Sequence, residues 1–293
     1  MTRIITSLSD ISESYDALFC DLWGCVHDGL APFAEAVTAL QAFRAKGCTV
    51  MLVTNAPRPH APVRRQLDRL GVPSDAYDGI ATSGDSARAA MLRGAVGEKV
   101  YFIGQPHDQD FFSPLELIEN PVTISHVPLE QAEGIVCCGP FDPLADPEEM
   151  RAQFLQAKTR GLKLLCANPD IVVDRGETRE WCAGALAKLY TQMGGESLYF
   201  GKPHKPVYEL ALKKLHEINP TVSKSEIICI GDGILTDILG GISYGLDTLF
   251  VTGGLSDQDT GTTNGELSPN EEKLTSFLQK ANVIPTNSIG YLR

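Results

Sequence analysis

The stretch FCDLWGCVHDGL, residues 19–30, carries an aspartate directly out of an apolar run and into a turn that contains glycine. Residues 17–21 are predicted to form a buried strand, so Asp21 would stand at its carboxyl end. A carboxylate in that place can be a metal ligand, a nucleophile or a turn-capping group. For this aspartate alone the cap is the simplest interpretation, and the bulky Trp23 two residues later needs a separate explanation.

Strand-like runs alternate with helical patterns on both sides of this stretch. The βαβαβ rhythm near the amino terminus, which returns in the last third of the chain, predicts an α/β fold with a parallel sheet covered by helices. The middle of the chain predicts a second α/β unit. The predicted strands are residues 17–21, 49–53, 79–82, 100–103, 134–138, 163–167, 227–230 and 248–251. The predicted helices include residues 177–193, 206–218, 235–244 and 270–281.

The composition is that of a globular protein with an acidic surface. The chain has 293 residues, of which 43% are apolar and 21% charged, and its formal net charge is −12. Such a surface repels nucleic acid and anionic membranes, so neither is expected as a partner. It also repels anionic metabolites, and a phosphate-binding site would therefore need a local cation.

The cysteines and the apolar runs indicate in which cellular compartment the protein is expected. The eight cysteines form no CxxC pair, which favours buried, reduced thiols over a zinc or redox site. No run approaches the ~18 apolar residues of a membrane span, and the first residues show no secretion signal. A cytoplasmic location is the expectation, while the oligomeric state, a homo-oligomer included, stays open.

Besides Asp21, three more polar clusters stand at or near the ends of predicted strands, where open parallel sheets bind their ligands. Thr54 and Asn55 follow the second strand, and a hydroxyl with free backbone N–H groups suits a phosphate oxygen, although the pair is also ordinary turn chemistry. Lys202 lies between a glycine and a proline. The backbone therefore aims this side chain, unless it is simply a solvated lysine.

The last cluster is ICIGDGILTDILGG, residues 228–241. Asp232 follows a buried strand inside a Gly-Asp-Gly turn, and Asp237 comes five residues later. Two carboxylates beside a sharp turn favour a hard-cation site. The alternative is a helix cap by Asp232 with an exposed Asp237. The order of all four clusters along the chain is far more specific than any one of them.

With these motifs in this order, the chain resembles the haloacid dehalogenase (HAD) superfamily of phosphohydrolases, and more narrowly its class IIA, NagD-like branch. The matching stretches are residues 21–29, 52–55, 167–170, 201–203 and 231–237. The resemblance implies a Rossmann-like parallel-sheet core with an inserted α/β cap of the C2 type. The core would comprise residues 1–83 and 192–293, and the cap residues 84–191.

The resemblance also implies a chemistry for the four clusters. Asp21 would attack the phosphorus atom and form an aspartyl-phosphate, which splits one difficult displacement into two steps. Thr54 and the backbone of Asn55 would hold the transferring phosphoryl group. Lys202 would neutralise charge on both the nucleophile and the phosphate, so that this lysine and Asp21 are the candidate catalytic residues.

Mg²⁺ is the cofactor that the resemblance implies. Its ligands would be Asp21, the backbone carbonyl of Trp23 and Asp232, with Asp237 as a further ligand or as a group that orients bound water. The cation would also supply the positive charge that the acidic surface lacks. In the cap, Asn168 and Asp170 of the ANPD stretch are candidate substrate contacts, although Asn-Pro is also an ordinary turn starter.

Trp23 departs from the family pattern. Most phosphatases of this superfamily have a second aspartate there, which protonates the leaving oxygen and then activates water. An indole N–H can donate a hydrogen bond but cannot act as a proton-transferring acid or base near neutral pH, and general acid–base catalysis is typically worth ~10²–10⁴ in rate, so weakened activity is expected. His27 and Asp28 are candidate replacements, with shaping of the turn as their alternative role. A smaller class IIA subset shows D-x-W-G-x-x-H-D-G, and this chain resembles it.

Three functions remain after these observations. The favoured one is a Mg²⁺-dependent phosphomonoester hydrolase acting on a small phosphorylated metabolite, with a good leaving group or an acid from elsewhere. A dehalogenase-like hydrolase would need no proton for its halide, but the retained Asp232 and Asp237 argue against it. A nearly inactive phospholigand-binding protein would keep affinity without turnover.

Overall fold

The structure is a computed structural model and describes residues 2–113, 120–175, 178–263 and 267–293. The chain divides by its contacts into two units. Unit 1 comprises Met1–Thr54, Arg64–Ala81 and Tyr208–Arg293, and unit 2 comprises Asn55–Val63 and Thr82–Val207. Each contains a largely parallel sheet with helices, which confirms the predicted α/β class with a second α/β part. The predicted limits of the cap, residues 84–191, stay a prediction.

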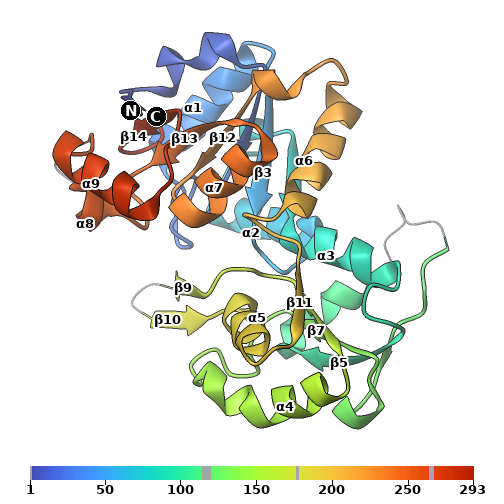
Figure 1. Cartoon of the computed structure of the whole chain (residues 1–293). Coiled ribbons are helices and arrows are strands. Elements are labelled where there is room, and N and C mark those ends of the chain that lie inside the picture. The colour runs from blue at the N-terminus through green and yellow to red at the C-terminus, as the bar shows by residue number, and fades with distance from the viewer. Residues whose placement is uncertain (1, 114–119, 176–177, 264–266) are drawn as a thin grey trace. The chain divides into compact units, whose positions relative to one another are not determined.

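The sheet of unit 1 has seven strands in the order β1-β14-β13-β12-β2-β3-β4 (Figure 1). All pairs from β1 to β3 are parallel. The two central neighbours, β2 and β12, pair so that Cys20 lies opposite Ile230. The strands are β1 (Arg3–Ile4), β2 (Ala17–Cys20), β3 (Thr49–Thr54), β4 (Gly79–Thr82), β12 (Ile227–Gly231), β13 (Asp247–Val251) and β14 (Asn287–Ile289). Because the central strands are buried along their length, they are continuous apolar runs.

Helices carry the crossovers between these strands, and their apolar faces cover the sheet. Helix α9, for example, places Leu274 and Leu278 in a cluster with Phe250 of β13. This helix begins where the Asn270 side chain accepts from the backbone N–H of Lys273. The helices are α1 (Ala34–Ala45), α2 (His60–Leu70), α6 (Lys205–Ile218), α7 (Leu239–Tyr244), α8 (Asp257–Thr260) and α9 (Glu271–Ala281), with a single π-helical turn at Ile234–Ile238. Helices α2 and α6 begin in unit 2.

Unit 2 has a five-stranded parallel sheet in the order β11-β8-β7-β5-β6. Successive residues of β7 and β8 face opposite sides, so that Ile135 and Leu164 join one apolar cluster while Val136 and Leu165 join another. Helix α3 covers the second cluster, and α4 and α5 cover the first. The elements are α3 (Ser83–Leu92), β5 (Lys99–Ile103), β6 (Ser125–His126), β7 (Gly134–Cys137), α4 (Arg151–Thr159), β8 (Lys163–Cys166), α5 (Ala183–Gln192) and β11 (Glu196–Tyr199).

An antiparallel hairpin precedes α5, where a longer helix was predicted. Strands β9 (Val172–Arg175) and β10 (Thr178–Trp181) pair with Trp181 opposite Val172. The predicted helix over residues 177–193 is therefore wrong over 178–181, and Glu177 lies outside the described residues. The helix begins only after Cys182, whose extended backbone forms its N-cap. Cross-strand pairing outweighed the helical spacing of the sequence at this point.

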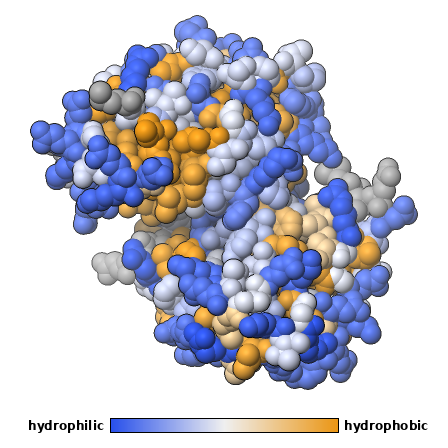
Figure 2. Space-filling view, in the orientation of Figure 1, coloured by the Kyte–Doolittle hydropathy of each residue, from blue (hydrophilic) through white to orange (hydrophobic). Residues whose placement is uncertain are grey.

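The visible surface is largely hydrophilic, and apolar side chains gather over the part of unit 1 where α7 and α9 lie (Figure 2). Leu235, Ile242 and Leu255 are among the exposed apolar residues of this unit. All eight cysteines lie in the described residues, and none forms a disulfide. None of the described helices combines the length and the apolar character that a membrane crossing requires.

Candidate active site

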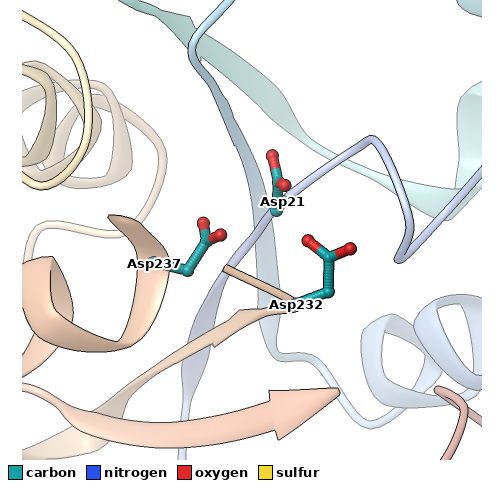
Figure 3. A group of neighbouring side chains, drawn as sticks. All are labelled: Asp21, Asp232 and Asp237. Atoms are coloured by element: carbon teal, nitrogen blue, oxygen red, sulfur yellow. The ribbon is translucent and has the colours of Figure 1, made fainter. Parts of the chain in front are cut away.

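Three buried carboxylates meet in unit 1 at the carboxyl ends of β2 and β12. Oxygens of Asp21, Asp232 and Asp237 all lie within 4.8 Å of one another, and the side chains are only 8%, 3% and 2% exposed. Figure 3 shows the Asp21 carboxyl group flanked by the other two. The structure thus brings together the three aspartates that the sequence singled out as candidate metal ligands.

The strand register explains why two of these side chains meet. Cys20, which ends β2, pairs with Ile230, and Gly231 ends β12, so Asp21 and Asp232 each directly follow the last residue of their strand. The backbone N–H of Asp21 continues the ladder by donating to the carbonyl of Ile230 at 2.9 Å. Parallel neighbours end at the same edge of a sheet, and the two carboxylates therefore share that edge.

Asp232 is held by backbone groups that approach it closely. Its Oδ2 atom accepts a hydrogen bond from the backbone N–H of Leu255 at 3.0 Å. A Cβ atom at Gly24 or Gly254 would overlap the same carboxylate, and Gly24 also has a φ of +75°. Glycine is required at position 24 for both reasons. The glycine of the D-x-x-G motif is thus a packing requirement of the carboxylate cluster.

Asp237 comes from the π-helical turn after β12. Its Oδ2 atom accepts from the backbone N–H of Gly233 at 3.2 Å and from the hydroxyl of Thr236 at 3.3 Å. The hydroxyl of Tyr208, a buried side chain of α6, donates to the backbone carbonyl of Asp237 at 3.3 Å. Sequence reasoning missed Tyr208, because a tyrosine at helical spacing looks like any other core residue.

The donor set suits a divalent hard cation. Like charges this close and this buried repel one another strongly, and a bound cation removes that repulsion. Three carboxylates offer only oxygen ligands, which Mg²⁺ prefers. The neighbouring Cys25 is buried, and burial, followed by the negative charge of Asp232, raises the pKa of its thiol well above the usual value. Cys25 is therefore a neutral packing group beside the carboxylates.

The loop after Asp21 is built around Trp23. Its indole meets the His27 ring edge to face, with 5.4 Å between ring centres, and a Cβ atom at Gly29 would overlap the indole. Gly29 has a φ of +87°, a conformation that favours glycine. The absence of a side chain at this position also leaves space for the indole. Trp23 is thus an integral part of the loop. Its backbone carbonyl as a metal ligand stays a prediction.

His27 and Asp28 both shape this loop. The Nδ1 atom of His27 accepts from the backbone N–H of Gly29 at 3.0 Å, and burial lowers the pKa of the imidazole. Asp28 accepts from the backbone N–H groups of Leu30 and Ala31, each at 2.8 Å, and these bonds lower the pKa of its carboxyl. Asp28 is therefore a turn-capping anion and a poor proton donor at neutral pH.

The predicted phosphate-binding residues fall in both units. Thr54 ends β3 in unit 1 and is 9% exposed. Asn55 and Lys202 belong to unit 2 and are 4% and 3% exposed. The Asn55 side chain holds the backbone of Lys202 through two hydrogen bonds. The catalytic and binding roles of these three residues stay predictions.

The two candidate cap residues have partners within unit 2. The Oδ1 atom of Asn168 accepts from the backbone N–H of Asp170 at 3.0 Å, which makes the local turn that Asn-Pro predicted as an alternative. The Oδ1 atom of Asp170 accepts from Asn55 Nδ2 at 2.8 Å. Substrate contact by either residue stays a prediction.

Comparison with known proteins finds similarity to hydrolases over most of the chain. The profile of the haloacid dehalogenase-like hydrolases matches residues 18–117, and a second profile, HAD-hydrolase-like, matches residues 199–273. The chain is 27% identical over 248 residues to the ribonucleotide monophosphatase NagD of Escherichia coli, covering 83% of this chain and 89% of that protein. It is 25% identical to human glycerol-3-phosphate phosphatase, covering 92% and 86% of the two chains.

A solved structure is more similar still. A hydrolase of the haloacid dehalogenase-like family from Brucella suis 1330 superposes with a TM-score of 0.84 and 40% sequence identity. The match covers 99% of this chain and 100% of the Brucella chain. The similarity therefore extends over nearly all residues of both units.

Proposed function

The chain belongs to the haloacid dehalogenase-like family of hydrolases, and from that premise we propose that it is a Mg²⁺-dependent phosphomonoesterase. Its substrate would be a small phosphorylated metabolite. The observation that carries the proposal is the cluster of three buried carboxylates at the ends of β2 and β12. The named relatives, a ribonucleotide monophosphatase and a glycerol-3-phosphate phosphatase, act on phosphate esters and support the choice over dehalogenation.

Asp21 is the proposed nucleophile. One of its carboxylate oxygens attacks phosphorus, the bond from phosphorus to the ester oxygen breaks, and an aspartyl-phosphate forms. Water then cleaves this intermediate and restores Asp21. The Thr54 hydroxyl and the Asn55 backbone N–H donate to phosphoryl oxygens, and the Lys202 ammonium balances the negative charge that spreads over them.

The residues proposed to hold Mg²⁺ are Asp21, Asp232, the Trp23 carbonyl and Asp237, the last as a ligand or through water. A bound Mg²⁺ would supply Lewis acidity and positive charge for the phosphoryl oxygens. Asp232 is oriented for this role by the Leu255 N–H, and Asp237 by Gly233 and Thr236. These bonds leave the carboxylates little freedom, which keeps the cluster arranged before a substrate arrives.

Trp23 is proposed to mark a subset of the family that works without the second aspartate. The chain carries the whole D-x-W-G-x-x-H-D-G pattern, and the structure gives Trp23, Gly29 and His27 mutual contacts. Such mutual packing favours a retained feature over accidental damage. Leaving-group protonation then comes from solvent or substrate, so good leaving groups are favoured.

A substrate panel tests the proposal. Aryl, sugar, polyol and nucleotide phosphates are incubated with the protein in MgCl₂ and in excess chelator, and released phosphate is measured. We expect release only with the metal. Metal-independent halide release from 2-haloacids would point instead to a dehalogenase, and tight phosphate-ester binding with no turnover to a binding protein.

Binding of Mg²⁺ is expected to raise the melting temperature, because it relieves repulsion within the carboxylate cluster. At a concentration of 100 times Kd the gain is about 2.7 kcal/mol, or a shift of roughly 5 °C. Differential scanning fluorimetry with and without MgCl₂ measures it. Asp237→Asn removes one charge, so it should raise the melting temperature of the metal-free protein and shrink the response. An unchanged response in this variant contradicts the assignment of Asp237.

The Trp23→Asp variant is expected to help poor leaving groups more than good ones. A carboxyl at this position restores a proton donor, and general acid catalysis contributes ~10²–10⁴ where protonation limits the rate. The loss of the indole contacts with Gly29 and His27 opposes part of that gain. We therefore expect about a tenfold higher kcat for a sugar phosphate and little change for 4-nitrophenyl phosphate. Equal effects on both substrates would show that another acid serves the site.

A further inference from the structure

The side chain of Asn55 is almost completely buried in unit 2, directly after the end of β3. Its Oδ1 atom accepts from the backbone N–H of Lys202 at 2.7 Å, and its Nδ2 atom donates to the backbone carbonyl of the same residue at 3.1 Å. The Asn55 amide therefore bonds both the backbone N–H and the backbone carbonyl of Lys202. Both bonds span 147 positions of sequence, so they join segments that the chain itself leaves far apart.

The remaining N–H of the amide is also used. Asn55 Nδ2 donates to Asp170 Oδ1 at 2.8 Å, a bond strengthened by the negative charge of the carboxylate. One oxygen thus faces a donor and one nitrogen faces two acceptors, which fixes the orientation of the amide. Both N–H groups of the side chain have partners. The work of this side chain is therefore to hold other groups, while the backbone N–H of Asn55 serves the proposed phosphate site.

The segment around Gly201 packs closely against the Asn55 amide. A Cβ atom at Gly201 would overlap Asn55 Oδ1, and it would come within 2.6 Å of both Pro169 Cδ and Ser83 Oγ. Because residue 201 is glycine, the segment 201–203, which we call the lysine loop, can approach the Asn55 amide closely. Asn168 Oδ1 in turn holds the backbone N–H of Asp170 at 3.0 Å, which orients the carboxylate toward Asn55.

We propose that Asn55 is the positioning residue of the lysine loop. Its amide sets the backbone of Lys202, and Asp170 locks that amide in place. This inference rests on the proposed phosphatase function, because it assigns to Lys202 the role of balancing phosphoryl charge. It also gives Asp170 a role that requires no contact with the substrate: an anchor between the ANPD stretch and the lysine loop.

Four variants separate the contribution of Asn55 from that of Asp170. Asn55→Ala removes all three bonds, and Asp170→Ala removes only the charge-assisted one. Asn55→Asp keeps the acceptor for the Lys202 N–H but places a carboxylate against Asp170. The double variant Asn55→Asp with Asp170→Asn lets the new amide donate to the new carboxylate, which restores that bond with its direction reversed. The matched control is Asn219→Ala, on the exposed turn directly after α6, where the side-chain amide oxygen accepts from the hydroxyl of Thr221 at 3.0 Å.

The readouts are kcat and KM for 4-nitrophenyl phosphate with Mg²⁺, the Kd of orthovanadate by calorimetry, and the melting temperature. Misplacing a catalytic group by about 1 Å costs ~10²-fold. We expect Asn55→Ala to lower kcat roughly 30–100-fold and to weaken vanadate binding at least about tenfold, and Asp170→Ala to have about a tenth of the effect on kcat. The double variant should recover part of the activity that Asn55→Asp loses, and Asn219→Ala should match the wild type.

A merely structural role would give a different result. In that case Asn55→Ala would lower the melting temperature while kcat and vanadate affinity of the folded protein stayed within about twofold of the wild type, and the proposal would be overturned. Absence of rescue in the double variant would overturn the anchor role of Asp170. A wild-type protein that neither releases phosphate nor binds vanadate would instead reject the phosphatase function itself.

Discussion

The Asp21→Asn variant is expected to lose phosphatase activity by a factor of at least about 10⁴, the size of effect seen when a catalytic group that acts in a set is removed. An amide oxygen is a far poorer nucleophile than a carboxylate, so no aspartyl-phosphate can form. The fold should persist, because asparagine has nearly the same shape and reduces repulsion among three buried carboxylates. Phosphate release in MgCl₂ and the melting temperature are measured on the same preparation.

The matched control for this substitution lies at the other end of the same strand. Asp16 immediately precedes β2 and is exposed, so Asp16→Asn removes one charge without touching the carboxylate cluster. It should keep wild-type activity. Mass spectrometry of protein quenched in acid during turnover should find a phosphorylated peptide containing Asp21 in the wild type only. Undiminished release by Asp21→Asn would eliminate the covalent mechanism and leave direct attack by water.

The positions of Asp21 and Asp232 in the carboxylate cluster could be predicted from sequence because each has a local signal. A buried parallel strand is a continuous apolar run, and a carboxylate that ends it must lie at the sheet edge. Asp21 and Asp232 both meet this condition, and the register of β2 with β12 places them side by side. The apolar pattern of each strand therefore predicts where the strand ends and which carboxylate follows it. It does not predict which strands are neighbours in the sheet.

The contacts of Asn55 with Lys202 and Asp170 could not be predicted in this way. They join residues 115 and 147 positions apart, and side-chain bonds of that range leave no periodic trace in a single sequence. The prediction of a helix where β9 and β10 form a hairpin was wrong for a related reason. Residues 178–181 carry helical spacing locally, but pairing with β9 decides their conformation. Tyr208 is likewise indistinguishable from a core tyrosine until its hydroxyl is found on the Asp237 carbonyl.

The Lys202→Met variant is expected to lower kcat by about 10³-fold, the upper end of the loss found when one preorganised stabilising group is removed from a buried site. Methionine keeps much of the apolar stem and removes the ammonium, so packing changes little while the positive charge disappears. Lys202 is only 3% exposed, and burial makes its charge worth more than a surface charge. Single-turnover release of 4-nitrophenol measures the loss in the phosphorylation step directly.

Two comparisons decide what that loss means. Lys205→Met makes the same change three residues later on an exposed position at the start of α6, and it should leave kcat unchanged. Lys202→Arg keeps the charge but replaces a compact ammonium with a broad planar group at a position that is buried and whose backbone is held by Asn55. It should therefore recover only a small part of the rate. Full activity in Lys202→Met would mean that the charge of the transferring phosphoryl group is balanced by the metal alone, and Asn55 would then be holding a loop with no catalytic cation.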